Sequence, residues 1–249
     1  MGFKNKVVIV TGASSGIGAA IAVAFSSQGA KVVIVGRNEV KLGKVHDQCS
    51  SDTLAILADV AKDEDVRRIV ELTIKKFGQI DILVNNAGLG RVASLHDSNI
   101  MEAYDTIMNV NVRGLIHLTS LAAPHLAKTK GNIVNISSVS ALMTPSIPGM
   151  INYYVSKAAV SHFGRCAAAE LAPLGIRVNT VSPGPVKTDF LDNADMNFSW
   201  DKASKQTCLN RVSEPEEIAD LVLFVASDKA RGITGSDFLS DDGILIKRE

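Results

Sequence analysis

The sequence is poor in cysteine, and its cysteines are widely spread. The 249 residues contain three of them, Cys49, Cys166 and Cys208. They form no Cys-x-x-Cys pair, so the pattern indicates neither a disulfide framework nor a zinc site. Free thiols of this kind are typical of a reducing compartment, and we therefore expect a cytoplasmic protein.

The chain also lacks an excess of charge of either sign. Lys and Arg together number 26, and Asp and Glu together number 26. This balance gives no support for nucleic acid or an acidic membrane surface as a partner, because both select a basic patch. The histidines show no ligand spacing with carboxylates or cysteines, so no metal site is predicted at His46, His96, His117, His125 or His162.

Long apolar runs are absent as well. No run reaches the roughly 18 residues that a membrane span needs. The first apolar stretch begins at about Lys6, which leaves no room for a signal peptide, and we expect none. Hydrophobic residues nevertheless make up 46% of the chain, which is enough for a sizeable core. The length fits one large domain, and no linker or repeat suggests a second.

The residues that are present are organised around one stretch near the start of the chain. The run Val7-Val8-Ile9-Val10 is typical of a buried strand. Gly12, Gly16 and Gly18 follow, and then apolar residues at helical spacing. A strand, a glycine turn and a helix present unpaired helix N–H groups to an anion, such as the pyrophosphate of a dinucleotide. The spacing differs from Gly-x-Gly-x-x-Gly, so a plain glycine-rich turn remains the alternative.

Strands and helices alternate through the rest of the chain. Apolar stretches predict further strands at 31–35, 53–58, 82–84, 133–136, 176–181 and 237–239. Helical patterns occupy 66–77, 101–128 and 153–174, and a capping box of Ser213 and Glu216 predicts the start of another helix. This order predicts a doubly wound parallel α/β sheet of the Rossmann type, with helices on both faces, in a single domain. Ligands of such sheets bind beyond the carboxyl ends of the strands.

Polar clusters along this pattern carry a resemblance to a known family. They are Thr11-Gly-x-x-x-Gly16-x-Gly18, Asp59, Asn85-Asn86-Ala87-Gly88, Asn111, Ser138, Tyr153-x-x-x-Lys157 and Pro183-Gly184 with Thr188. With these motifs in this order, the chain resembles the short-chain dehydrogenase/reductase family, in its common single-domain branch, over essentially its full length. The resemblance implies hydride transfer between a nicotinamide cofactor and a ketone or secondary alcohol.

Tyr153 and Lys157 are the first candidates for the chemistry. They lie four residues apart on a predicted helix and therefore share a face. A tyrosine hydroxyl titrates near ~10, and we expect the Lys157 ammonium to lower the pKa of Tyr153 toward the working pH. Tyr153 would then exchange a proton with the substrate oxygen as a general acid–base group. Tyr154 is a rival by residue type, and the family pattern selects Tyr153.

Ser138 and Asn111 complete the expected catalytic set. The Ser138 hydroxyl follows the fifth strand and would hydrogen-bond the substrate oxygen. Ser137 and Ser140 are the alternatives, and the resemblance favours Ser138. The interval from Ser138 to the catalytic tyrosine is longer than the resemblance leads us to expect, so the pocket shape cannot be taken from relatives. Asparagine is a poor mid-helix residue, and the resemblance implies that Asn111 bends its helix and holds a water linking the catalytic lysine to solvent.

The resemblance also implies a bound nicotinamide dinucleotide. The residues expected to hold it are Gly12, Ser14, Ser15, Gly16, Ile17, Gly18, Arg37, Asp59, Val60, Asn86, Ala87, Gly88, Tyr153, Lys157, Pro183, Gly184, Val186 and Thr188. In this set the glycines approach the pyrophosphate, Asp59 and Val60 contact adenine, and Thr188 holds the carboxamide end.

The end of the second predicted strand favours NADP(H) over NAD(H). A protein that binds NAD usually places Asp or Glu there to accept hydrogen bonds from the ribose 2′-hydroxyl. This chain has Gly36-Arg37-Asn38 instead, and a guanidinium pairs with a 2′-phosphate in bidentate fashion. Glu39 is the nearest acid, and it would point elsewhere if a helix starts at Asn38.

Two stretches, 142–151 and 190–200, would form the walls of the substrate pocket. Their apolar residues are Leu142, Met143, Ile147, Met150, Ile151, Phe190, Leu191, Met196, Phe198 and Trp200. Mostly apolar walls suit an apolar ligand, so we expect a bulky carbonyl compound or alcohol of steroid-like or isoprenoid type. The segment 186–211 is long and lacks a clear period, as expected of a mobile lid that orders over the substrate.

Two other functions remain open from the sequence. One is a 3-oxoacyl-carrier-protein reductase, whose acidic partner would need a basic patch near the pocket. The other is a non-catalytic binding protein on the same fold, although such a protein need not keep the full catalytic set. The resemblance, together with an alanine-rich helix over 153–174, predicts a homo-oligomer, and specifically a tetramer.

Overall fold

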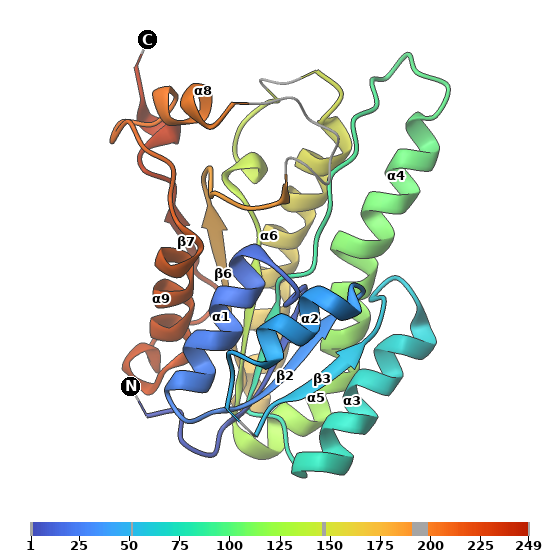
Figure 1. Cartoon of the computed structure of the whole chain (residues 1–249), viewed down its shortest axis with the longest axis vertical. Helices are drawn as coiled ribbons and strands as arrows, with labels where there is room; N and C mark the ends of the chain where they lie inside the picture. The colour runs from blue at the N-terminus through green and yellow to red at the C-terminus, as the bar shows by residue number, and fades with distance from the viewer. Residues whose placement is uncertain (1, 51, 146–147, 191–198, 249) are drawn as a thin grey trace.

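The computed structural model describes residues 2–50, 52–145, 148–190 and 199–248. Within them, the strands form one parallel sheet in the order β3-β2-β1-β4-β5-β6-β7 (Figure 1). Their bounds are β1 Val7–Thr11, β2 Lys31–Gly36, β3 Leu54–Leu57, β4 Ile82–Asn85, β5 Asn132–Ile136, β6 Arg177–Pro183 and β7 Asp237–Ser240. The predicted doubly wound parallel sheet is confirmed, and each strand lies close to its predicted bounds.

Helices cover both faces of the sheet. One face carries α1 Gly16–Ser27, α2 Glu39–His46 and α9 Pro215–Ala226, and the other carries α3 Asp63–Phe77, α5 Leu115–Thr129 and α6 Ile151–Leu171. The two layers follow from the alternation of strand side chains. In β1, Val8 and Val10 join the core under α1 and α9, whereas Val7 and Ile9 join the core under α3 and α5. The strands are apolar throughout because both of their faces are covered.

Two further helices stand near the carboxyl ends of the strands, α4 Ile100–Met108 and α8 Trp200–Lys205. In Figure 1, α8 lies beside the segment that follows β7. No helix within the described residues is both long and apolar enough to cross a membrane.

The helix predicted over 101–128 is interrupted. α4 passes into a π-helical turn at Asn109–Gly114 before α5 begins. The Asn111 amide accepts the N–H of Leu89 at 2.9 Å and donates to the carbonyl of Leu89 at 3.0 Å. Gly114 allows the carbonyl of Val60 to approach, since a Cβ at this glycine would lie 2.4 Å from that oxygen. The distortion therefore occurs at the predicted residue, as a π turn of the kind that often marks functional sites.

The capping box of α9 lies one residue beyond its predicted place. Glu214 is the N-cap, Pro215 is the first helical residue, and the Glu217 carboxylate accepts the N–H of Glu214 at 2.7 Å. The prediction with Ser213 and Glu216 is wrong because proline is favoured at the first helical position. The Ser213 hydroxyl instead donates to Asp242 at 2.8 Å.

The direction of winding reverses at β1. The chain runs outward from β1 through β2 to β3, and then outward from β4 on the other side of β1. Loops that leave β1 and β4 therefore separate, and a crevice opens beyond their carboxyl ends.

Candidate active site

A cleft with a volume of about 300 Å³ lies at this edge of the sheet. The predicted residues that line it are Gly12, Ser15, Gly16, Ile17, Gly18, Asn86, Gly88, Ser138, Tyr153, Lys157, Pro183, Gly184, Val186 and Thr188. They come from the ends of β1, β4, β5 and β6, from the start of α1 and from α6. Most of the candidate residues are thus brought into one cavity by strands that end at the same edge.

Other predicted residues lie outside the lining of this cleft. Val60 and Ala87 line a separate, much smaller cavity. The Ser14 side chain packs against β2, where a Cβ at Gly36 would lie 3.1 Å from it. Asn111 is buried at 1% exposure. Arg37 and Asp59 also lie outside the lining.

The glycine turn is fixed by the protein's own packing. A Cβ at Gly18 would lie 2.3 Å from the carbonyl oxygen of Gly12, and Gly12 itself has φ +66°. The Asn86 amide donates to the carbonyl of Thr11 at 2.9 Å, and its backbone N–H donates to the Thr11 hydroxyl at 3.0 Å. Close backbone contacts therefore require glycine at Gly12 and Gly18. Asn86, which follows β4, holds the turn in place through its hydrogen bonds to Thr11.

The start of α1 fits an anionic ligand. Ser15 is the N-cap, and its side chain makes no capping hydrogen bond to the helix. The first N–H groups of α1 thus lack a side-chain cap, and a helix N-terminus of this kind attracts phosphate. At Gly16, φ is +53° and a Cβ would lie 2.9 Å from Thr188. The segment after β6 therefore lies against the start of α1 at Gly16, where a side chain would collide with Thr188.

Tyr153 and Lys157 share the inner end of the cleft, with the Lys157 Nζ 5.7 Å from the centre of the Tyr153 ring. Desolvation raises the pKa of Tyr153 to about 12, although a hydrogen bond with Ser138 acts in the opposite direction and lowers it. Burial lowers the pKa of Lys157 to about 8, and its ammonium donates to the carbonyl of Ile136 at 2.9 Å. The predicted lowering of the Tyr153 pKa is therefore wrong for the chain by itself. Desolvation outweighs any attraction of the ammonium for a phenolate.

The three candidate serines are separated by their hydrogen bonds. The Ser137 hydroxyl donates to the carbonyl of Lys157 at 2.8 Å and accepts from Ser161 at 2.9 Å, so it ties β5 to α6. The Ser138 hydroxyl accepts the N–H of Ser140 at 3.1 Å and hydrogen-bonds Tyr153. This geometry favours Ser138 as the serine that meets a ligand.

Asn111 lies behind the cleft. Besides its two contacts with Leu89, its amide donates to the Ser156 hydroxyl at 3.0 Å. A Cβ at Gly88 would lie 3.4 Å from the Lys157 Nζ and 3.5 Å from the Asn111 Oδ1, so both polar groups flank the same glycine. The side chain thus fixes the Gly88 loop against α6.

Arg37 is largely free in solvent at the end of β2. Its side chain is 62% exposed, and its nearest acid is Asp59 at 3.9 Å. Asn38 caps α2 by accepting the N–H of Lys41 at 2.9 Å, so the helix begins at Glu39, one residue after the start considered from the sequence. Lys41 reaches across to Asp189, with 2.5 Å between Nζ and Oδ2.

The outer half of the cleft is mostly apolar. Met143, Met150, Phe190 and Trp200 line it as predicted. Leu142 does not, being 57% exposed, and neither does Ile151. The predicted wall residues Ile147, Leu191, Met196 and Phe198 lie outside the described residues.

Sequence reasoning missed some of this wall. Tyr154, Gln206 and Ile244 also line the cleft. Tyr154 is the residue that rivals Tyr153 by type, and the two rings pack edge to face with centroids 6.2 Å apart. Gln206 follows the short helix α8 and Ile244 follows the turn after β7, and no periodic pattern in the sequence marks either position.

The comparisons with known proteins agree with this geometry. Residues 12–244 match the family model described as enoyl-(acyl carrier protein) reductase. The chain is 35% identical to the 3-oxoacyl-[acyl-carrier-protein] reductase FabG of Thermotoga maritima, over 99% of this chain and 100% of the relative. It is 36% identical to the meso-2,3-butanediol dehydrogenase of Serratia marcescens, over 98% and 96% of the two chains.

A solved structure gives the same result. The 3-ketoacyl-(acyl-carrier-protein) reductase of Brucella melitensis, complexed with NADH, superposes with a TM-score of 0.90 at 34% identity, covering 98% of this chain and 100% of that one. Fold, cleft and sequence similarity therefore agree over nearly the whole chain. The protein belongs to the short-chain dehydrogenase/reductase family and is an oxidoreductase of that type.

Proposed function

We propose that the protein transfers a hydride reversibly between NADP(H) and a bulky, apolar ketone or secondary alcohol. The observation that carries this proposal is the convergence of the Tyr153 hydroxyl, the Ser138 hydroxyl and the Lys157 ammonium in one cleft with the glycine turn. A non-catalytic binding protein would have no need of this set. Oxidation of NADPH in the presence of carbonyl compounds distinguishes the two.

The proposed chemistry assigns one role to each side chain. The nicotinamide supplies or accepts the hydride when it is bound. Ser138 and Tyr153 hold the substrate oxygen between their hydroxyls, which fixes the carbonyl carbon for attack. Tyr153 gives its proton to that oxygen during reduction and takes a proton back during oxidation. A pKa of about 12 keeps Tyr153 protonated at neutral pH, which is the state that reduction requires.

Lys157 and Asn111 are proposed to support this proton transfer. The Lys157 ammonium would stabilise the phenolate left behind and hydrogen-bond the nicotinamide ribose. Asn111, fixed between Leu89 and Ser156, would hold a water that returns a proton from solvent.

The preference for NADP(H) rests on Arg37. Its guanidinium is 62% exposed, and its contact with Asp59 is long, at 3.9 Å, which leaves most of its N–H groups open to a phosphate. A 2′-phosphate would therefore gain a charge-assisted contact worth about 1.5–3 kcal/mol, or roughly 10- to 100-fold in preference. We expect Arg37→Asp to reverse the ratio of kcat/KM for NADPH and NADH. Arg231→Asp makes the same charge change at the opposite edge of the sheet and should leave the ratio as in the wild type. A wild-type preference for NADH would contradict the assignment.

The apolar substrate class rests on Met143, Met150, Phe190 and Trp200 in the outer cleft. A panel of steroid-like ketones, isoprenoid ketones, sugars and polyols tests it. Equal or better turnover of sugars or polyols would contradict it.

A second candidate is a 3-oxoacyl-carrier-protein reductase. It is favoured by the 35% identity to the Thermotoga maritima protein of that name. Turnover of a 3-oxoacyl thioester at a rate well above every ketone in the panel would select this function.

The lid, the assembly and the location are further proposals. The stretch 186–211 is proposed to close over the substrate. Residues 191–198 of this stretch lie outside the described residues. Of its described residues, Thr188, Phe190 and Trp200 line the cleft. Protease nicking that NADPH and substrate fail to suppress would count against a lid. A homotetramer is proposed on the resemblance, and a monomeric mass in light scattering would refute it. A cytoplasmic location is proposed on the three widely spaced cysteines.

A further inference from the structure

The segment that follows β7 turns back toward the cleft and supplies part of its wall. We call residues 241–247 the return segment. Asp242 and Gly243 have left-handed backbones, with φ of +49° and +80°, and they reverse the chain after β7. The carboxylate of Asp241 accepts the N–H of Gly243 at 3.0 Å, which holds the short turn that follows. Ile244 thereby reaches the cleft and lines it.

α8 forms the neighbouring part of this wall and depends on contacts outside itself. It spans 6 residues, too few for a helix to be stable alone. Trp200 from α8 and Gln206 just after it line the cleft. The ammonium of Lys247 donates to the carbonyl of Thr207 at 2.9 Å and contacts the carbonyl of Lys205. A cation from the return segment therefore caps the carboxyl end of α8.

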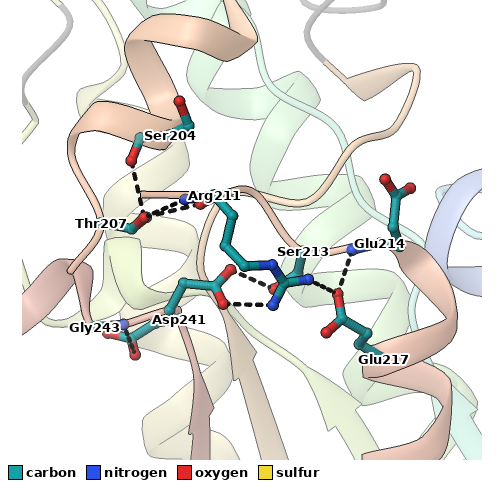
Figure 2. Close-up of polar contacts among 9 residues, drawn as sticks. Ser204, Thr207, Arg211, Ser213, Glu214, Glu217, Asp241 and Gly243 are labelled. Carbon is teal, nitrogen blue, oxygen red and sulfur yellow. Dashed lines mark hydrogen bonds and ion pairs between the residues drawn. The ribbon is translucent and has the colours of Figure 1, made fainter. Parts of the chain in front are cut away.

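Arg211 connects the return segment and the end of α8 to α9 (Figure 2). Its Nη1 donates to Asp242 Oδ1 at 2.9 Å, and its Nη2 donates to the Glu217 carboxylate at the start of α9. The Asp242 side chain is 5% exposed, and its other oxygen accepts the Ser213 hydroxyl at 2.8 Å. The backbone N–H of Arg211 donates to the Thr207 hydroxyl at 3.1 Å, next to the end of α8. One residue thus contacts α9, the return segment and the end of α8.

We propose that Arg211 is a positioning residue that holds Ile244 and α8 together as the substrate wall of the cleft. Asp242 supports this assignment because a left-handed backbone is costly for a residue other than glycine. Asp242 adopts this costly backbone conformation, and its buried carboxylate accepts a hydrogen bond from Arg211. The proposal rests on the proposed function in one respect, namely that the ligand facing Ile244 is the substrate.

The first test uses Trp200, the chain's single tryptophan, as a reporter of α8. Asp242→Asn keeps the size of the side chain and tolerates a left-handed backbone, but it removes the charge that Arg211 meets. We expect Asp242→Asn and Arg211→Gln to shift the Trp200 emission to longer wavelength and to increase its quenching by acrylamide. Asp220→Asn, at an exposed position of α9, is the matched control and should behave as the wild type.

Unchanged Trp200 emission and quenching in a folded Asp242→Asn protein would overturn the proposal. This measurement needs no turnover, so it stands even if the proposed reaction is not found.

The second test separates positioning from general stability. Ile244→Ala should raise the KM for the best ketone of the panel roughly ten-fold, as expected when a pocket loses methylene groups. Ile246→Ala changes the same residue type in the same segment at a side chain that is 75% exposed, and it should have no effect. Arg211→Gln should reproduce the rise in KM with kcat within about two-fold of the wild type and an unchanged Kd for NADPH. Equal effects at Ile244 and Ile246, or an Arg211→Gln protein that loses kcat and NADPH affinity in parallel, would show a purely structural role.

Discussion

The two walls of the cleft are stabilised in different ways. The wall at the glycine turn is held by the backbone contact between Gly12 and Gly18 and by the Asn86 amide, whose hydrogen bonds to the turn are uncharged. The wall at α8 is held by charged side chains, chiefly Arg211 and Lys247, which meet carboxylates and carbonyl groups near the surface. At Gly18, the wall at the glycine turn leaves no space for an added Cβ. The wall at α8 is instead formed by side chains, which substitutions can change without altering the backbone.

The difference matches what each wall is proposed to bind. A dinucleotide has one fixed shape, so a rigid surface suits it. Substrates differ among members of one fold, and specificity then resides in replaceable elements around a common scaffold.

The largest effect is expected at Tyr153, which lines the cleft from α6 and belongs to neither wall. Tyr153→Phe keeps the packing with Phe190, whose ring centroid lies 5.1 Å away, and removes only the hydroxyl. Turnover should fall by roughly 10²–10⁴-fold, the usual contribution of general acid–base catalysis, with the Kd for NADPH unchanged. Steady-state rates and cofactor titration measure both. If more than roughly a tenth of the wild-type rate remained, another group would have to be the acid.

The next effect is a pH dependence of stability caused by Lys157. Its pKa falls on folding from 10.5 to about 8 because of burial. The penalty for burying the ammonium is therefore complete below pH 8 and disappears as the pH rises toward 10.5. Lys157→Met removes the titrating group and with it this penalty. The free energy of unfolding of the wild type should therefore rise by up to about 3 kcal/mol relative to that of the variant between pH 7 and pH 10.

Denaturant unfolding of both proteins across that pH range measures the difference. The unpaired carbonyl of Ile136 left by the variant adds an offset that does not depend on pH. A constant difference would show that Lys157 titrates as an ordinary lysine.

A pair of glycine variants sharpens the contrast between the walls. Gly18→Ala places a Cβ 2.3 Å from the carbonyl oxygen of Gly12, whereas nothing lies within 4 Å of a Cβ at Gly43 in α2. We expect Gly18→Ala to lose roughly 1–3 kcal/mol of unfolding free energy and to weaken NADPH binding. Gly43→Ala should gain about 0.5–1 kcal/mol from helix propensity. If Gly18→Ala were as stable as Gly43→Ala, the turn would be adaptable and the comparison would fail.

The smallest effect is expected at an exposed ion pair between α2 and the segment that follows β6. Lys41 and Asp189 are each 45% exposed, and exposed pairs contribute about 0.2–1 kcal/mol. A double-mutant cycle of Lys41→Ala and Asp189→Ala should give a coupling energy below about 1 kcal/mol that shrinks with added salt. A coupling well above this range would mean that the segment after β6 is held firmly to α2 and is not free to adapt.

The glycine turn, the strand ends and most of the residues that meet in the cleft were predictable from the sequence. Parallel strands are buried on both faces and therefore read as unbroken apolar runs, and the polar residues after them gather at one edge. The Ser137 and Ser138 alternatives became distinguishable only in three dimensions, when Ser137 was found bonded to α6.

The substrate wall and the direction of the Tyr153 pKa could not be predicted in this way. Ile244 reaches the cleft through two left-handed residues after the last strand, and no periodicity reports such a turn. The Tyr153 pKa depends on how much protein surrounds the hydroxyl, which spacing along a helix does not reveal. The spacing of Tyr153 and Lys157 showed which groups meet, but not how strongly desolvation opposes their charges.

The position of β1 in the sheet has a consequence for folding. Val8 pairs with Val32 on one side and with Ile82 on the other. The first pairing closes a short loop, whereas the second requires all of β2, β3 and three helices to be present in between, and such long-range closures slow folding. During synthesis, one edge of this apolar strand therefore stays open until β4 has emerged. An open edge of this kind attracts other chains, so the yield of folded protein depends on how quickly β4 arrives.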